Sequence, residues 1–315
     1  MELNIKQGQS VKLINNLFNI PAEKEYYKKY KLVHPASLLL NKLKKIKLSL
    51  DDILVLKQEI EQNNNIMNFD KRYEKVIFDY IKALDELNDS YLLVIKATTL
   101  YNYDYKFHKD VNEWLKINNI ENYKKYKSAT FQENSFIRLL GDHVKHDDVK
   151  VAFLYLENFN HQKIYGFYLY DVIDEDEMHG PNPNIHVEYK NSSTAFSFNN
   201  FILKTLGIIS YNMFWLNKII FNKEKLKPYR DNILYELFSK SRTLEKLFFP
   251  DEYDKKYLHI VKNRDSLNLR YEKYLGLNND IVKIKNIEWG ISVIENKNYA
   301  KNKLPYLPLV YNGEI

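Results

Sequence analysis

The stretch "VKVAFLYLENFNHQKIYGFYLYDVIDED", residues 149–176, decides the fold expected for this chain of 315 residues. It alternates on either side of "NFNHQ" and is rich in aromatic and β-branched residues, a pattern typical of two antiparallel strands joined by a turn. The segment "HGPNPN", residues 179–184, predicts another turn that leads to a third strand near residues 185–189. We therefore expect a β insertion at about residues 150–190.

Two long helices are predicted before this insertion. The first is expected to begin at Ser49 or Asp51 and to end near residue 61, and the second to be capped by Asp70 and to end near residue 98. Three asparagines at residues 63–65 separate them, because asparagine competes locally for backbone hydrogen bonds. The two helices should therefore be antiparallel.

Helical spacing of apolar residues also flanks the insertion on both sides. Before it, we expect a short helix at about residues 109–118 and a longer one from about residue 120 or 128 to His146. After it, an almost wholly apolar helix is expected within residues 195–221, followed by a helix at about residues 230–249. Tyr211, Phe214 and Trp215 are interpreted as core residues of the apolar helix.

Beyond Pro250 the pattern changes to short runs typical of strands: "YLHIVK", "LNLRYEKY", "IVKIKNIEWGISVIE" and "LPLVYN". We expect a helical domain at residues 1–250, which carries the β insertion, and a small β-rich module at residues 251–315. The predicted fold class is mainly α, a helical bundle with an inserted antiparallel β-hairpin and a small β-containing C-terminal region, α+β overall.

The formal net charge of +6 suggests an anionic partner. Residues 22–50 hold eight lysines and two glutamates, interleaved with tyrosines. Such a segment is typical either of a nucleic-acid surface or of a solvated helix face. The candidate phosphate contacts in it are Lys28, Lys29, Lys31, Lys42, Lys44 and Lys45.

Several function classes are disfavoured. The chain has no cysteine, which excludes disulfides and thiolate sites and fits a reducing cytoplasm. The N-terminus lacks a signal-peptide pattern, and the longest uncharged run of the apolar helix is too short to span a membrane, so a cytoplasmic protein without membrane contact is expected.

The chemical groups of most interest lie in "NSFIRLLGDHVKHDDVK", residues 134–150. Within it, Arg138-Leu-Leu-Gly-Asp-His143 resembles the catalytic signature of the HEPN superfamily, small helical bundles found in RNases, toxins and phage-defence proteins. The resemblance covers at most about residues 51–250. It implies a metal-independent endoribonuclease of toxin or antiviral-defence type, which cleaves tRNA or mRNA without a cofactor. It also implies a site shared across a homodimer, and an antitoxin or defence-system protein as a possible partner.

The expected chemistry is attack of the RNA 2′-hydroxyl on the adjacent phosphate, which requires proton transfer near neutral pH and a fixed cation. His143 suits the first role and Arg138 the second. In an ideal helix, however, these two side chains point about 140° apart. One polar stripe instead contains Asn134, Arg138, Asp142, Lys145 and His146. His146 is therefore an alternative proton carrier, Asn134 and Asp142 are candidate orienting groups, and Lys145 is a candidate phosphate contact.

Three other interpretations remain open. The motif can be the polar face of an ordinary amphipathic helix, with an Arg138–Asp142 pair and histidines at its C-terminal end. The chain can be a non-catalytic helical protein that binds nucleic acid or a protein partner. Finally, the His146-Asp147 doublet resembles that of HD-type phosphohydrolases, which would add a metal site.

Overall fold

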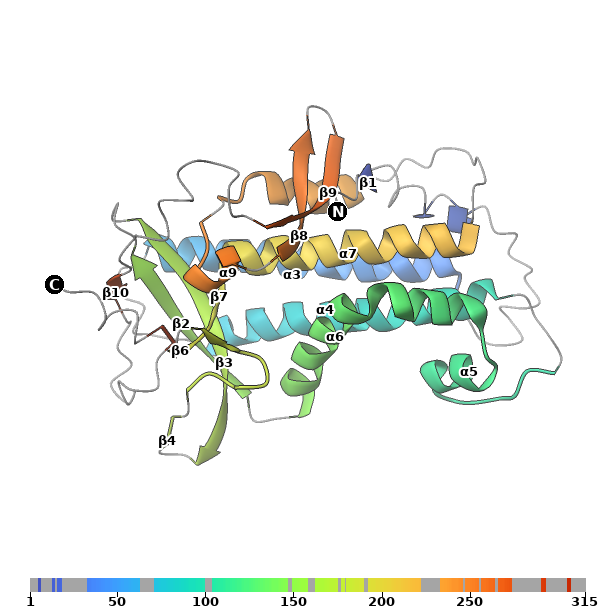
Figure 1. The fold of residues 1–315 in the computed structure, drawn as a ribbon, viewed down its shortest axis with the longest axis horizontal. Coiled ribbons are helices and arrows are strands. Elements are labelled where there is room, and N and C mark those ends of the chain that lie inside the picture. The colour runs from blue at the N-terminus through green and yellow to red at the C-terminus, as the bar shows by residue number, and fades with distance from the viewer. Residues whose placement is uncertain are drawn as a thin grey trace.

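The computed structural model of the chain describes residues 5–6, 13–14, 16–18, 33–62, 71–99, 104–146, 149–157, 162–174, 177–178, 180–189, 192–221, 233–245, 247–254, 256–263, 266–273, 290–292 and 305–306. Figure 1 shows long helices side by side, with a small β region at one end.

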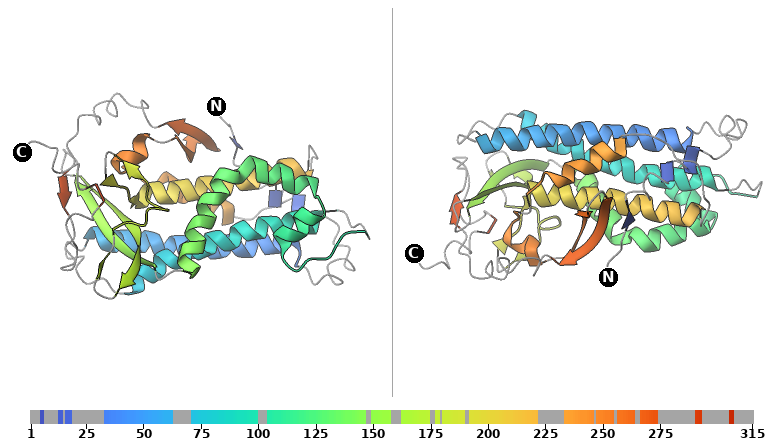
Figure 2. Two further views of the ribbon diagram at one scale, coloured as in Figure 1. Left: turned by 60° about the horizontal axis from the view of Figure 1, so that its bottom comes forward. Right: turned by 90° about the horizontal axis from the view of Figure 1, so that it is seen from above.

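Four long helices form the bundle: α3 (Pro35–Gln62), α4 (Lys71–Thr98), α6 (Glu121–His146) and α7 (Phe198–Phe221). Helices α3 and α4 are antiparallel, because Glu86 of α4 bonds to Lys42 near the start of α3 whereas Arg72 bonds to Glu59 near its end. Leucine and isoleucine side chains from these helices fill one continuous core. The right panel of Figure 2 shows the bundle from above. The mainly α fold with an inserted hairpin is confirmed.

The start of α3 differs from the prediction. The helix begins at Pro35, which suits a first helical position because it has no N–H to leave unbonded. The Ala36 N–H donates to His34 Nδ1 at 3.2 Å, which caps this end. Ser49 and Asp51 therefore lie inside α3 and cap nothing, and the apolar residues before them, such as Leu39 and Leu43, continue the buried face.

The next helices agree with the prediction. Helix α4 begins directly after Asp70, and a short helix, α5 (Val111–Ile117), begins after Asp110, whose side chain accepts from the Glu113 N–H at 2.8 Å. Residues 63–65, the predicted break between the first two helices, lie outside the described residues. Figures 1 and 2 show that α6 bends along its length and ends near the β region.

The inserted hairpin is confirmed. Strands β2 (Val149–Glu157) and β3 (Lys163–Asp174) pair antiparallel in one unbroken register, with Phe153 opposite Phe167. Phe167 is fully buried against Phe201 of α7, their ring centroids 5.1 Å apart. The hairpin therefore closes one end of the helical core.

The predicted third strand is different in place and partner. Strand β5 has only two residues, Glu188–Tyr189, and pairs with β6 (Ser192–Ser193) in a sheet of its own. Besides β2, the strands that pair with β3 are β4 (Glu177–Met178) and β7 (Phe196–Ser197). Gly166 permits the approach of β7, because a Cβ at this position would lie 2.2 Å from the Phe196 carbonyl oxygen.

The predicted helix at residues 230–249 is also shorter than expected. Helix α8 covers Ile233–Ser239, a 3₁₀ turn η1 follows at Lys240–Arg242, and α9 begins at Pro250 and ends at Asp254. Phe248 and Phe249 leave the helical path and are fully buried beside the hairpin. Burial of these two rings in a second core accounts for the early end of the helix.

The C-terminal strands are confirmed in part. Strands β8 (Lys256–Asn263) and β9 (Ser266–Lys273) form a hairpin that pairs with β1 (Ile5–Lys6), whereas β10 (Gly290–Ser292) pairs with β2. The segment at residues 307–312 lies outside the described residues. These pairings cross the expected boundary at Pro250, and the division into modules at residues 1–250 and 251–315 stays a prediction.

Among the described residues, no helix has the length and apolar character needed to cross a membrane.

Candidate nucleic-acid interface

The motif end of α6 is joined to α4 by two charged pairs. Arg138 Nη2 lies 2.6 Å from Asp89 Oδ1, and Lys145 Nζ bonds to Asp85. The carboxylate of Asp85 is only 2% exposed, and Gly141 lets the helices approach there, since a Cβ on Gly141 would lie 2.6 Å from Asp85 Cγ. This stripe of the motif therefore holds α6 against α4.

The same contacts determine the charge state of the two cations. The hydrogen bond to Asp85 raises the pKa of Lys145. Partial burial opposes protonation of Arg138, but the hydrogen bond and charge of Asp89 outweigh it and raise the pKa of that guanidinium. Both side chains remain charged, and the charge of Lys145 is directed at a buried carboxylate.

The structure does not join the other motif residues to Arg138. Asp142 is exposed, so the alternative Arg138–Asp142 pair is replaced by Arg138–Asp89. His143 is half-buried five residues along α6, and the side chain of His146 lies outside the described residues. Within one chain, the hydrogen-bond partner of Arg138 is a carboxylate of α4, so the described contacts do not pair this guanidinium with a proton carrier.

Asn134 belongs to a polar network between α6 and α7. Its Nδ2 donates to Thr130 Oγ1 at 2.9 Å and to the Tyr126 hydroxyl at 3.2 Å, and its Oδ1 accepts from Asn212 Nδ2 at 2.8 Å. The Tyr126 hydroxyl also donates to Asn212 Oδ1. Because both ends of the Asn134 amide are bonded, this side chain serves to position α6 on α7.

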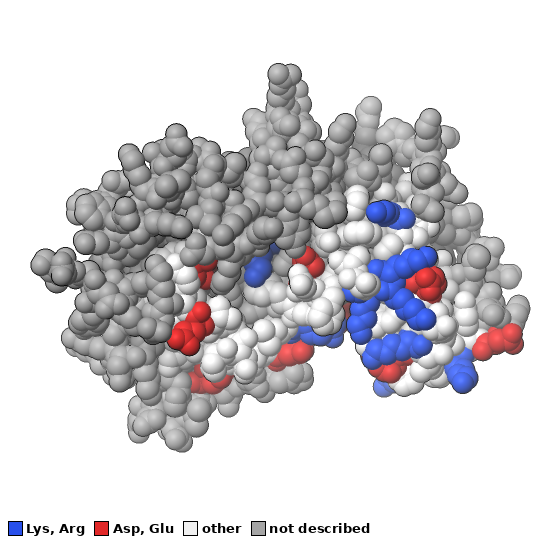
Figure 3. Space-filling view, viewed as in Figure 1, with Lys and Arg blue, Asp and Glu red and all other residues white. Residues whose placement is uncertain are grey.

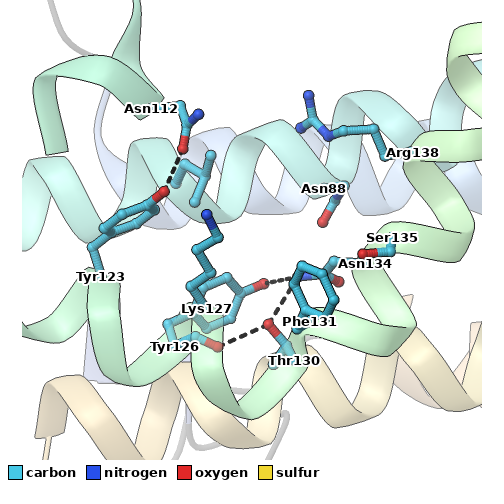
Figure 4. A pocket seen from close by; sticks show the side chains of 11 residues that line it. Asn88, Asn112, Tyr123, Tyr126, Lys127, Thr130, Phe131, Asn134, Ser135 and Arg138 are labelled. Atoms are coloured by element: carbon cyan, nitrogen blue, oxygen red, sulfur yellow. Dashed lines mark hydrogen bonds between the residues drawn. The ribbon is translucent and has the colours of Figure 1, made fainter. Parts of the chain in front are cut away.

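A first pocket of about 270 Å³ lies beside this network. Figure 4 shows Arg138 at the top of the pocket, the Lys127 side chain in the middle of the view and the ring of Phe131 in the lower part. Phe131 is 59% exposed, so much of its ring is open to solvent at the pocket. The pocket is lined by Asn88, Leu92, Asn112, Tyr123, Tyr126, Lys127, Thr130, Phe131, Asn134, Ser135 and Arg138.

A second pocket of about 720 Å³ lies between the first half of α6 and the end of α7. Tyr211 and Trp215 of α7 form its aromatic wall, and the Tyr211 hydroxyl donates to the Ala129 carbonyl at 3.2 Å. Lys218 Nζ lies 4.6 Å from the centroid of the Trp215 ring. Lys124 and Lys125 line the pocket from α6, so it combines cations with aromatic rings.

We call the surface that joins the two pockets the basic face; it consists of Lys124, Lys125, Lys127, Phe131, Arg138, Tyr211, Trp215 and Lys218. Figure 3 shows Lys and Arg side chains gathered over the place that α6 occupies in Figure 1. Lys124, Lys125 and Lys127 are all exposed. Within the described part of the chain, the only carboxylate that pairs with any of the three is Glu121, 3.4 Å from Lys125.

The lysines singled out from the sequence are placed differently. Lys42 and Lys45 both bond to Glu86, at 2.8 and 2.6 Å, so this one carboxylate offsets one of their two positive charges. Lys44 and Lys45 are both exposed. Lys28, Lys29 and Lys31 lie outside the described residues. Sequence reasoning missed the basic face, although the run Lys124-Lys125-Tyr126-Lys127 was a signal for it.

A third pocket of about 330 Å³ is lined in part by two buried carboxyl groups, those of Asp251 and Glu252. Glu252 accepts from the Ser197 N–H at 3.0 Å, the Ser197 hydroxyl at 2.6 Å and the Phe249 N–H at 2.8 Å. It therefore lies at the N-terminal ends of both α7 and α9. Burial, and then the charge of Asp251, raises the pKa of Glu252 to about 8. These bonds indicate a structural role for Glu252, which connects the starts of α7 and α9.

The described residues do not form the ligand cluster that the metal interpretation requires. Among the described residues, no three His, Asp or Glu side chains come together as metal ligands. The side chain of His146 and residues 147–148, on which that interpretation depends, lie outside the described residues.

Comparison of the chain with protein-family models, with curated proteins and with solved structures found no match.

Proposed function

We propose that this protein binds RNA through the basic face of α6. The observation that carries the proposal is the exposure of Lys124, Lys125 and Lys127 between two pockets with aromatic walls. Among the described residues, only Lys125 of these three has a carboxylate partner, Glu121. Exposed lysines favour a phosphate backbone, because binding releases the counterions that the phosphates had condensed. Exposed rings such as Phe131 add surfaces on which unpaired bases stack.

Cleavage of the bound RNA is a second candidate function. It is favoured by Arg138, whose side chain is 48% exposed at the edge of the first pocket and can reach a phosphate placed there. The guanidinium would then stabilise the charge that develops on the phosphate as the 2′-hydroxyl attacks. His143 of the same helix would have to come from a second protomer to act as the proton carrier, because the two side chains diverge along α6.

RNA affinity and its salt dependence test the proposal. A labelled RNA is titrated with the wild type, with the triple variant Lys124→Gln/Lys125→Gln/Lys127→Gln, and with the matched control Lys42→Gln/Lys44→Gln/Lys45→Gln. We expect the first variant to lose at least about tenfold in affinity at low salt. Its log–log salt slope should fall by about 0.7 for each phosphate contact removed from a single strand. Equal losses in both variants would reject the basic face as the binding surface.

Cleavage is tested on the same RNA in EDTA, with wild type, Arg138→Ala and His143→Ala. The second candidate function predicts cleavage products with the wild type and none with either variant at RNA concentrations that saturate binding. His143→Ala should bind as the wild type does, and Arg138→Ala more weakly, because Arg138 belongs to the basic face. Binding without any cleavage by the wild type would leave RNA binding as the function and remove the enzymatic one.

A further inference from the structure

The second pocket has features that the basic charge alone does not require. Tyr211 and Trp215 are four residues apart on α7, so both face the same side of the helix, and their ring centroids lie 6.2 Å apart in an edge-to-face arrangement. Phe214 contacts Trp215 in the same way, at 5.5 Å. Tyr211 is only 8% exposed and is bonded to α6, so it forms the floor. The Trp215 ring therefore packs against two aromatic neighbours at the pocket wall.

Cations surround this ring from two helices. Lys124 and Lys125 lie on the α6 side, and the ammonium of Lys218 lies over the Trp215 ring. Two acidic side chains act nearby: Glu121 pairs with Lys125 at 3.4 Å, and the charge of Glu133 acts on Tyr211. Among the described residues, three lysines line the pocket itself and no acidic side chain does, so an anionic ligand is favoured.

The Trp215 ring and the three lysines of the pocket together suit one nucleotide, which has a base to stack on the ring and a phosphate to contact the lysines. An exposed cation–π contact such as that of Lys218 is weak, and a nucleobase can replace it on the indole face because base–aromatic stacking is stronger. The displaced ammonium then remains close enough to contact the phosphate. A pocket of about 720 Å³ falls in the range of small-ligand sites and has room for a base with its sugar.

We propose that the second pocket is a stacking site for an unpaired base of single-stranded RNA, with Trp215 as the platform and Lys124, Lys125 and Lys218 as phosphate contacts. Bases within a duplex are already stacked and paired, so they cannot present a face to Trp215. The site therefore selects single strands over duplexes. This inference rests on the proposed RNA binding and specifies which form of RNA is bound.

Trp215 itself supplies the test. The chain has three tryptophans, so Trp114→Phe/Trp289→Phe leaves Trp215 as the single reporter. This protein is titrated with an oligouridylate of about eight nucleotides, with a duplex RNA of equal length and with inorganic polyphosphate. Binding is followed independently by anisotropy of a label on each RNA, and by the ability of polyphosphate to compete with the labelled RNA. We expect the single strand to quench Trp215 fluorescence in step with binding, and the duplex and polyphosphate to bind without that quenching.

A substitution provides the second arm. Trp215→Leu should weaken binding of the single strand by about 5- to 100-fold and leave duplex binding unchanged, whereas Trp215→Phe, which retains a stacking face, should recover most of the loss. Circular dichroism confirms that each variant is folded. If Trp215→Leu does not fold, the fluorescence titration decides alone.

The outcomes separate this inference from the proposed function. Binding of the single strand without a change in Trp215 fluorescence would overturn the stacking site and leave RNA binding intact. The same conclusion would follow from equal losses of single-strand and duplex binding in a folded Trp215→Leu variant. If neither RNA binds the wild type, both the function and the inference fail.

Discussion

The two halves of α6 carry similar positive charges, but these charges differ in their partners. In the second half, Arg138 and Lys145 pair with Asp89 and Asp85 of α4, and Asp85 is almost fully buried. In the first half, Lys124, Lys125 and Lys127 remain exposed, and among the described residues only Glu121 pairs with one of them. The difference lies in the neighbouring helices, because α4 supplies carboxylates to the second half of α6 and α7 supplies aromatic rings beside the first half. A cation becomes structural or available for a ligand according to what its neighbours offer.

The largest expected effect concerns a buried acid outside α6, Glu252, which is 2% exposed. Its folded-state pKa, about 8, exceeds the ordinary value of 4.5. The folded state therefore binds this proton more tightly than the unfolded state does. The resulting contribution to the free energy of unfolding is complete below pH 4.5, and up to about 3–5 kcal/mol of it is lost as the pH rises through 8. We expect the denaturant midpoint to fall between pH 5 and 9, measured by urea unfolding. Glu252→Gln should flatten this dependence, and exposed Glu121→Gln should not; an unchanged slope in Glu252→Gln would contradict the assignment.

The next effect concerns the close contact of the second half of α6 with α4. Gly141→Ala would place a methyl group 2.6 Å from Asp85 Cγ, and overpacking of this kind costs about 1–3 kcal/mol. Alanine favours a helix over glycine by about 1 kcal/mol, which offsets part of the loss. We expect a net destabilisation in thermal unfolding. Ser135→Ala, at an exposed position of the same helix, is the control. A stabilised Gly141→Ala would show that the helices do not approach there.

A smaller effect is expected for Arg138→Ala. The ion pair with Asp89 is about half exposed on both sides, so solvent screens it and its contribution is about 0.2–1 kcal/mol. Chemical unfolding should show a loss in this range. A loss above 2 kcal/mol would indicate that Arg138 is as structural as Lys145 and would weaken any role at the pocket.

The smallest effect on stability should come from the first half of α6. The triple variant Lys124→Gln/Lys125→Gln/Lys127→Gln removes exposed cations near the start of a helix, where positive charge is unfavourable. We expect a change in melting temperature of less than about 2 °C, in either direction. Its RNA affinity should nevertheless fall. A large loss of stability would break the comparison, because these lysines would then also be structural.

Much of the fold could be predicted from local patterns. Helix α4 follows its apolar spacing, and the β2–β3 hairpin follows the alternation around residues 158–162. Asp70, the predicted cap of α4, lies outside the described residues. The errors arose where two local signals competed. Ser49 resembles a helix cap, yet it lies inside α3, because the buried face of that helix is continuous from Ala36 to Ile60. Phe248 and Phe249 continue a helical pattern, yet both are drawn into the hairpin core.

The candidate site was less predictable. The segment at residues 134–150 contains arginine, histidines and aspartates at suggestive spacing, but nothing in its spacing indicates that Asp85 and Asp89 will meet two of its cations. Trp215 packs against the core, as its sequence environment predicts, but it also lines a pocket, which the sequence does not indicate. In both cases the deciding contact lies far away along the chain.

By itself the sequence determined the elements and the charge: the helical and strand periods, the excess of lysine and the absence of cysteine. These follow from each residue and its near neighbours, since period and propensity are local properties. The tertiary structure alone decided which cations are neutralised and which rings face solvent. Those outcomes depend on distances between helices that are remote in the chain, where burial and a partner's charge determine the energy of each group.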